Sequence, residues 1–226
     1  MDIAERLPAC AARERLAALE ALYARADEAV RRFQDAAGLS CPFGCGSCCE
    51  GFVPDILPAE AEYLAAYLAV AEPERAYALA ATGIEATAYP GGRLGCPLYR
   101  PDTPYHCSVY EARPLICRLF AFSAVRDKRG EPSYSLCRLM PDAAAAPGLR
   151  RAAGDGLKSF GAVPAPVMAD FGSEAAALCP AGGERGPLPE RLEAALSKIL
   201  FLVGLSANAD PENDGPDLSP PVPNAS

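Results

Sequence analysis

The chain has 226 residues, of which 50% are hydrophobic and 22% charged, and its formal net charge is −8. This length predicts one sizeable core with extensions and excludes two large independent domains. The negative charge argues against a nucleic-acid partner, because proteins that bind phosphate backbones normally present a basic face.

The amino-terminal residues lack the basic start and apolar run of a secretory signal, and no segment reaches the length of a membrane span. We therefore expect a cytoplasmic protein with no membrane partner. A reducing cytoplasm keeps thiols free, so that clustered cysteines favour metal binding over disulfides.

Residues 1–38 are expected to form an amphipathic helix, because apolar side chains such as Leu16, Leu19 and Tyr23 recur at spacings of three and four. Gly38 is placed to end this helix. Its apolar face should cover the core, although a protein partner that docks on the same face is an alternative. Cys10, at the start of the helix, is expected to be a small buried side chain.

Residues 39–141 form the predicted cysteine-cluster domain. The elements expected within it are helices over about 59–71 and 74–81, a turn cluster over 90–95, a strand over 105–110, a helical turn from Pro114, and a hairpin of 120–125 and 133–137 around Gly130. Most of this region is short and irregular. It should therefore form a small β and loop core for the cysteines.

Residues 142–205 are rich in alanine, with a helix expected near 149–160 and a clearer one over 189–203. Cys179 lies in a Gly- and Pro-containing stretch away from the other cysteines and is expected to have no part in a site. Residues 206–226 form an acidic, Pro-rich tail that we expect to be disordered. The whole pattern predicts a mainly helical α+β fold, with helices packed around the cysteine core.

Four thiols within nine residues, in Cys41-Pro-Phe-Gly-Cys45-Gly-Ser-Cys48-Cys49, are more than packing requires. Single cysteines follow at positions 96, 107, 117 and 137, in segments rich in Pro, Arg and aromatic residues. Thiolates are strong ligands for Zn²⁺ and for iron–sulfur clusters. Eight of them could supply two four-coordinate sites, or one site and spare thiols.

Cationic side chains beside the cysteines would offset the negative charge of a thiolate-bound metal. Arg113 and Arg118 flank Cys117 and are proposed for this role, with ordinary surface or ion-pair arginines as the alternative. His106 is the single histidine and precedes Cys107, and its role is left open.

The spacing Cys41-x₃-Cys45-x₂-Cys48 is also the one with which radical-SAM enzymes hold a cluster with an open iron. Those enzymes build a barrel from repeated strand–helix units, and this sequence shows no such repeat. The fold pattern therefore argues against that class.

The blocks CPFGCGSCC, CPLY and HCSVYEARPLICR, with a final cysteine, resemble the YkgJ-like cysteine-cluster family of zinc- or iron-chelating CxxCxxCC proteins over residues 41–137. The resemblance implies a metal-ligand set of Cys41, Cys45, Cys48, Cys49, Cys96, Cys107, Cys117 and Cys137. Related blocks also occur in flagellin lysine N-methylases, which are larger enzymes that share the cysteine block alone.

The leading hypothesis is a metal-binding protein that chelates zinc or an iron–sulfur cluster through these cysteines. The alternatives are an iron–sulfur redox or methyl-transfer enzyme and a metal storage or delivery protein. Nucleotide-binding and hydrolase motifs are absent from the sequence, and one histidine supplies little acid–base chemistry. A protein partner, the native metal and the existence of a reaction are left open.

Overall fold

Six α-helices and three small antiparallel sheets make up the described part of the computed structural model, residues 3–140, 151–160, 163–179 and 183–209. The helices are α1 (Ala11–Ala37), α2 (Pro58–Ala71), α3 (Pro73–Thr82), α4 (Leu115–Leu119), α5 (Met168–Ala177) and α6 (Leu188–Ala209). Short 3-10 helices occupy Ala4–Arg6, Pro104–His106, Tyr110–Ala112 and Gly154–Phe160. This arrangement confirms the predicted mainly helical α+β class. None of the described helices has both the length and the apolar character needed to cross a bilayer.

The strands are short. They are β1 (Asp55–Ile56), β2 (Thr87–Tyr89), β3 (Arg93–Gly95), β4 (Val125–Arg126), β5 (Pro132–Ser135), β6 (Arg151–Ala153) and β7 (Gly186–Pro187). β2 and β3 form a hairpin, β4, β5 and β6 a three-stranded sheet, and β1 pairs with β7. The β1–β7 pair places the segment before α2 beside the start of α6.

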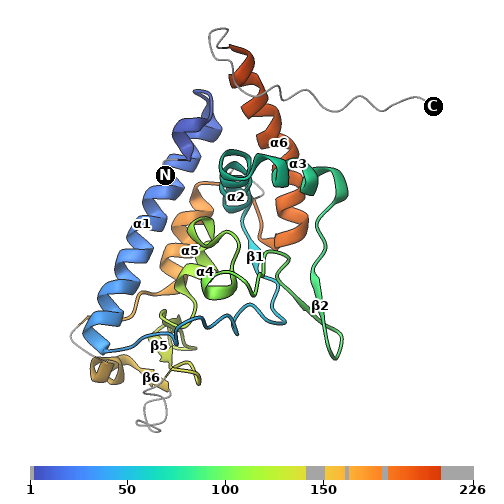
Figure 1. Ribbon diagram of the computed structural model, residues 1–226. Coiled ribbons are helices and arrows are strands. Elements are labelled where there is room, and N and C mark those ends of the chain that lie inside the picture. The colour runs from blue at the N-terminus through green and yellow to red at the C-terminus, as the bar shows by residue number, and fades with distance from the viewer. Residues whose placement is uncertain (1–2, 141–150, 161–162, 180–182, 210–226) are drawn as a thin grey trace.

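The long helix α1 runs along one edge of the molecule (Figure 1). Its predicted apolar stripe is buried, with Leu16, Leu19 and Phe33 fully so. Gly38 ends the helix with φ at 64°, and its N–H bonds the carbonyl of Gln34. Glycine adopts this left-handed conformation without steric cost, as expected for a helix end.

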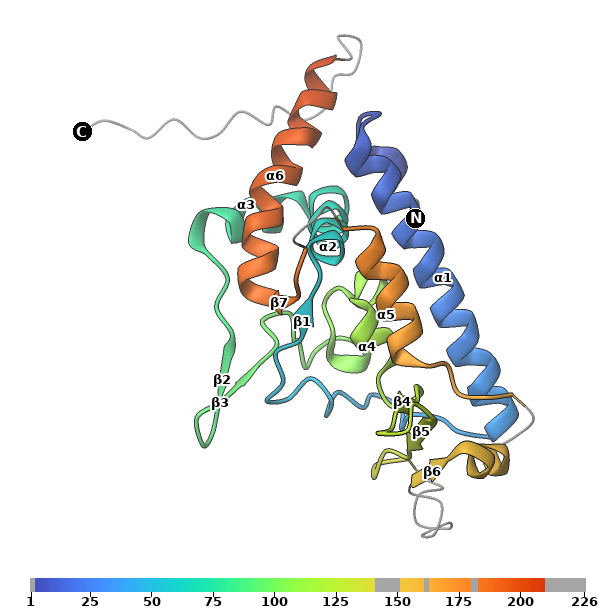
Figure 2. The same ribbon diagram turned by 180° about the vertical axis from the view of Figure 1, so that it is seen from behind.

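Helix α2 lies in the centre, between α1 and α6 in both views (Figures 1 and 2). It is buried on nearly all sides, and its many alanines let the neighbouring helices approach closely. Glu62 of α2 accepts hydrogen bonds from Arg15 of α1 at 3.0 Å and from Lys198 of α6 at 2.5 Å. The three helices therefore form a scaffold held by apolar packing and by one buried carboxylate.

The cysteine-bearing segments lie at one end of this scaffold. Residues 39–54 pass below α4 on their way from the end of α1 to β1 (Figures 1 and 2). The helices predicted over 59–71 and 74–81 and the helical turn after Pro114 are confirmed. The hairpin around Gly130 is present, but its first strand is only Val125–Arg126, and residues 120–122 form a turn. Of the turn cluster predicted over 90–95, residues 90–92 join β2 to β3, and the rest is β3, which leads into Cys96.

Two local predictions are wrong. The strand expected over 105–110 is replaced by 3-10 turns, because Tyr105 and His106 adopt positive φ angles of 56° and 54° that no strand accommodates. The helix expected near 149–160 is a strand over Arg151–Ala153 followed by a 3-10 helix, while residues 149–150 lie outside the described residues.

Helix α5 was not expected, because the Gly and Pro content around it hides its short apolar pattern. Helix α6 continues to Ala209, so residues 206–209 of the expected disordered tail are helical. The remainder of that tail, 210–226, lies outside the described residues.

Glu60, near the start of α2, is completely buried. Its carboxylate accepts the N–H of Leu57 at 2.9 Å and the N–H of Leu115 at 2.7 Å. Arg185 and the hydroxyl of Tyr23 complete its set of partners. One carboxylate thus satisfies buried backbone donors at the starts of both α2 and α4, the helix that carries Cys117.

We predict that Glu60→Ala lowers the free energy of unfolding by about 3 kcal/mol, because it leaves two buried N–H groups and one arginine without a partner. Urea unfolding followed by circular dichroism measures the loss. The exposed Glu85 provides the matched control Glu85→Ala, which should unfold at the same urea concentration as the parent protein. Equal midpoints for the two variants would show that Glu60 does not hold the fold.

Candidate metal centre

The first cysteine block, residues 41–49, folds as two consecutive tight turns. The N–H of Cys45 bonds the carbonyl of Pro42 at 3.0 Å, and the N–H of Cys49 bonds that of Gly46 at 2.9 Å. Gly44 has φ at 66°, which a residue with a side chain rarely adopts. These turns hold four thiols on one short loop, with Cys48 the most exposed of them.

The second half of the site is assembled from three separate segments. Cys96 follows β3, and Cys107 forms an isolated antiparallel bridge with Tyr99. Cys117 lies in α4 and Cys137 follows β5. These segments are distant in the sequence and meet because α4 and the two hairpins all end at the same side of the scaffold.

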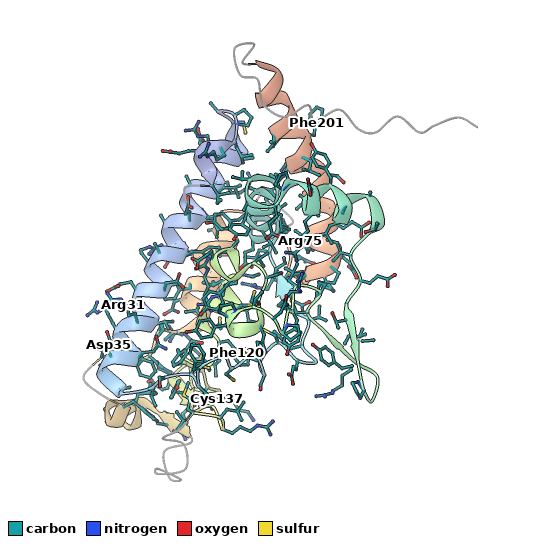
Figure 3. All side chains as sticks on the ribbon, in the orientation of Figure 1. Arg31, Asp35, Arg75, Phe120, Cys137 and Phe201 are labelled. Atoms are coloured by element: carbon teal, nitrogen blue, oxygen red, sulfur yellow. The ribbon has the colours of Figure 1, made fainter. Side chains whose placement is uncertain are left out.

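All eight predicted cysteines line a single half-open pocket of about 400 Å³. Figure 3 shows Cys137 and Phe120, another residue of its wall, at the same end of the molecule. Cys10 and Cys179 do not line it, in agreement with their exclusion from the predicted site. Cys10 precedes α1, and the Cys179 thiol faces the Ala175 carbonyl at 3.8 Å.

The thiols line the pocket without converging on one point. Across the described ranges, no three His, Cys, Asp or Glu side chains come close enough together to hold a metal ion. The Sγ atoms of Cys48 and Cys49 are 3.9 Å apart. All ten cysteines are free thiols.

The thiols that raise the pKa of Cys41 differ, apart from Cys48, from those that raise the pKa of Cys117. Burial, together with the nearby thiols of Cys45, Cys48 and Cys137, raises the pKa of Cys41 to about 11. Burial also raises the pKa of Cys117 well above its usual range, with Cys96, Cys107 and Cys48 as the neighbouring thiols. We call Cys41, Cys45 and Cys137 the Cys41 group, and Cys49, Cys96, Cys107 and Cys117 the Cys117 group. Cys48 lies between the two.

Backbone amides already point at several of the sulfurs. The N–H groups of Leu98 and Tyr99 lower the pKa of Cys96, although burial raises it to about 11 overall. The N–H of Val109 likewise lowers the pKa of Cys107, but burial raises it by more. Amide donors of this kind favour a charged sulfur, as a metal-bound thiolate would be. The donor set therefore suits a thiolate-bound metal.

A hydrogen bond between the adjacent thiols of Cys48 and Cys49 shifts their pKa values in opposite directions. A hydrogen bond from the Cys49 thiol lowers the pKa of Cys48 to about 7, and the positive charge of Arg113 lowers it as well. The same bond raises the pKa of Cys49 far above its usual range. Cys48 is thus the thiol that ionises at neutral pH, on the exposed side of the pocket.

The two arginines proposed to offset thiolate charge have different surroundings. Arg113 lies over the ring of Tyr110 at 4.0 Å, and its buried Nε has no hydrogen-bond partner among the described residues. Its charge lowers the pKa of Cys48, Cys107 and Cys117. These contacts support its predicted role.

Arg118 is buried, and its nitrogens bind the carboxylate of Asp27 and the carbonyls of Glu111 and Arg113. It joins α4 to α1 and to the preceding loop. Its guanidinium also lines the pocket, so the predicted role toward a metal stays a prediction.

Several residues of the pocket were not anticipated. Phe52 and Phe120 form a tilted aromatic pair, with ring centroids 6.3 Å apart, and both line the pocket beside the thiols. Tyr105 stacks on Tyr110 with centroids 4.9 Å apart. The proximity of these aromatic residues to the cysteines in the sequence was a signal, but packing on distant elements decides which of them reach the pocket.

Residues 40–138 match the protein family CxxCxxCC, described as a putative zinc- or iron-chelating domain. This match spans all eight cysteines of the pocket. No curated protein and no solved structure matches the chain.

We predict that Cys48 is the fastest thiol to react with iodoacetamide in reduced, metal-free protein, because the thiolate is the nucleophile. At pH 8 its thiolate fraction should exceed that of Cys96 about 1000-fold, given pKa values of about 7 and about 11, so its labelling should be much faster. Its rate should rise as the pH increases through about 7 and then level off. Peptide mass spectrometry at a series of pH values measures these rates.

Arg113→Gln provides the internal control, because it removes a charge that favours the Cys48 thiolate. In Arg113→Gln the labelling curve of Cys48 should move to higher pH. The matched variant Arg93→Gln, at an exposed arginine, should leave the curve in place. Equal labelling of Cys48 and Cys96, or an unmoved curve for Arg113→Gln, would contradict this account of the site.

Proposed function

We propose that this chain is a metal-binding protein whose eight cysteines hold zinc or an iron–sulfur centre. The observation that carries the proposal is the pocket itself, which gathers every cysteine between residues 41 and 137 and excludes the other two. Free thiols in one pocket, amide donors aimed at two of them and a cation beside them are the surroundings that thiolate-bound metals require.

We further propose that the thiols divide into two sites. The Cys117 group contains four cysteines, the number that one tetrahedral zinc or one four-iron cluster takes. The Cys41 group contains three and would be completed by Cys48, one of the thiols that influences Cys41. The adjacent cysteines 48 and 49 would then serve different sites, which places the two metals close together.

Arg113 would offset part of the negative charge of this arrangement. Four thiolates around Zn²⁺ carry a net charge of −2, which is costly to bury without a nearby cation. Its positive charge lowers the pKa of Cys48 and of Cys117, and stacking on Tyr110 keeps its orientation.

Storage or delivery of the metal is a second candidate function, favoured by the exposure of Cys48. Transfer of a metal proceeds by exchange of ligands, so it requires at least one thiol that an incoming ligand can displace. Cys48 is exposed on the open side of the pocket.

We predict two metal sites per chain when the protein is purified without oxygen and without an affinity metal column. Metal and acid-labile sulfide analysis with a visible spectrum distinguishes zinc from iron–sulfur clusters. Cys117→Ser and Cys137→Ser should each lose about one site and retain the other, since they belong to different groups.

The matched controls are Cys10→Ser and Cys179→Ser, which should keep the full metal content. Protein that contains neither zinc nor iron, or that loses metal equally in the Cys10 and Cys117 variants, would refute metal binding by this pocket. Loss of both metals from each single variant would refute the division into two sites.

We also predict that chelation of the metal leaves the helical scaffold folded. Helices α1, α2 and α6 pack through apolar side chains that do not include the cysteines of the pocket. Removal of a ligand present at 100 times its dissociation constant costs about 2.7 kcal/mol, which lowers the melting temperature by roughly 5–10 °C in a chain of this size. Far-ultraviolet circular dichroism during chelation and thermal melting tests this, and complete loss of the helical signal on chelation would contradict it.

A further inference from the structure

A chain of hydrogen bonds joins the first cysteine block to the segment that carries Cys107. The Tyr99 hydroxyl oxygen is 3.1 Å from the Glu50 carboxylate and 3.1 Å from His106 Nδ1. A phenol has one proton, which here goes to the carboxylate, so Nδ1–H must be the donor in the second bond. Glu50 directly follows Cys49, and His106 directly precedes Cys107. The chain of bonds therefore connects the two halves of the metal centre.

The backbone at His106 is held in an unfavourable conformation. Both Tyr105 and His106 have positive φ, at 56° and 54°, a region that residues with side chains rarely adopt. The carbonyl of His106 accepts the N–H of Arg100 at 3.0 Å, which fixes the turn. Such a conformation persists only where the surroundings enforce it, and it is often found at functional sites. Here it brings the imidazole against the first cysteine block.

Gly46 is the point of contact between the block and the imidazole. A Cβ atom added at Gly46 would lie 2.3 Å from His106 Nδ1 and 2.5 Å from its Cγ, closer than real side-chain atoms approach. Gly46 is buried and lies between Cys45 and Cys48. The absence of a side chain there is what allows the loop to sit directly on the ring.

The ring of Tyr99 packs against two other rings, those of His106 and Tyr89. The centroid of the Tyr99 ring is 5.5 Å from that of His106, with an angle of 88° between the ring planes. It is 6.1 Å from the centroid of the Tyr89 ring in β2, with an angle of 71°. Tyr89 in turn lies against Gly95, the residue before Cys96. The β2–β3 hairpin therefore holds Tyr99 in place while its hydroxyl group reaches the block.

We propose that Glu50, Tyr99 and His106 form a latch that holds the first cysteine block against the segments of Cys96 and Cys107. They are positioning residues for the metal centre, and this role rests on the proposed function. The latch brings Cys49, with Glu50 attached, toward Cys96 and Cys107, the thiols with which it would share a metal.

The hydrogen-bonding part of this role can be separated from simple packing. Tyr99→Phe removes both hydrogen bonds and keeps the ring. Glu50→Gln retains a carbonyl oxygen that can accept the phenol proton, whereas Glu50→Ala retains none. A purely structural role for the ring would leave all three variants alike.

Two measurements test the latch in the full chain. In metal-free protein, amide hydrogen exchange over residues 41–50 should be faster in Tyr99→Phe and Glu50→Ala than in the parent, and close to the parent in Glu50→Gln. Zinc affinity, measured by competition with a chelator, should fall about tenfold in the first two variants, as is typical for residues that orient metal ligands. The control is Tyr77→Phe, at an exposed tyrosine of α3, which should change neither quantity.

The outcomes separate the latch from the proposed function. Parent-like exchange and affinity in Tyr99→Phe would overturn the latch, and so would equal defects in Glu50→Gln and Glu50→Ala. A parent protein that binds no zinc would overturn the proposed function, while the exchange rates would still decide whether the latch exists. A global change in melting temperature for Tyr99→Phe would assign it to general stability and count against the latch.

Discussion

The structure depends on the burial of one carboxylate, that of Glu60. Its two oxygens accept backbone N–H groups at the starts of α2 and α4, and they also bind Arg185 from the segment before α6. An ionised carboxylate is tolerated in an apolar interior only when such partners surround it. The same interactions that stabilise the helical scaffold therefore set the position of α4, and with it the position of Cys117 in the pocket.

The helices and the cysteine-bearing segments have different roles in the structure. Three helices supply a core that needs no cysteine, and the loops at one end of it supply the thiols. Loops built from tight turns can bring many donors together at a short distance, but they bury little apolar surface of their own. Contacts between the loops then become the main interactions that keep them in place. The match to the CxxCxxCC family over residues 40–138 is consistent with this arrangement.

Much of the helical architecture was predictable because the apolar stripes of α1 and α6 and the glycine at position 38 are local signals. Helix α5 was missed because its pattern is short and its neighbours are Gly and Pro. The strand expected over 105–110 was wrong for a different reason. Aromatic residues there indicated a strand, but contacts of His106 with Gly46 and Tyr99 require a left-handed turn. Glu60 lies in the first turn of α2, and nothing local in the sequence shows that its carboxylate is buried.

The sequence by itself identified the candidate metal ligands, because thiols are soft ligands and eight of them cluster between residues 41 and 137. It also determined the amphipathic helices, whose periodicity is a property of neighbouring residues. Only the tertiary structure decided that all eight thiols line one pocket, that Arg113 lies near Cys48 and Cys117, and that Arg118 is held by Asp27. These relations join residues far apart in the chain, so they arise from packing and from no local pattern.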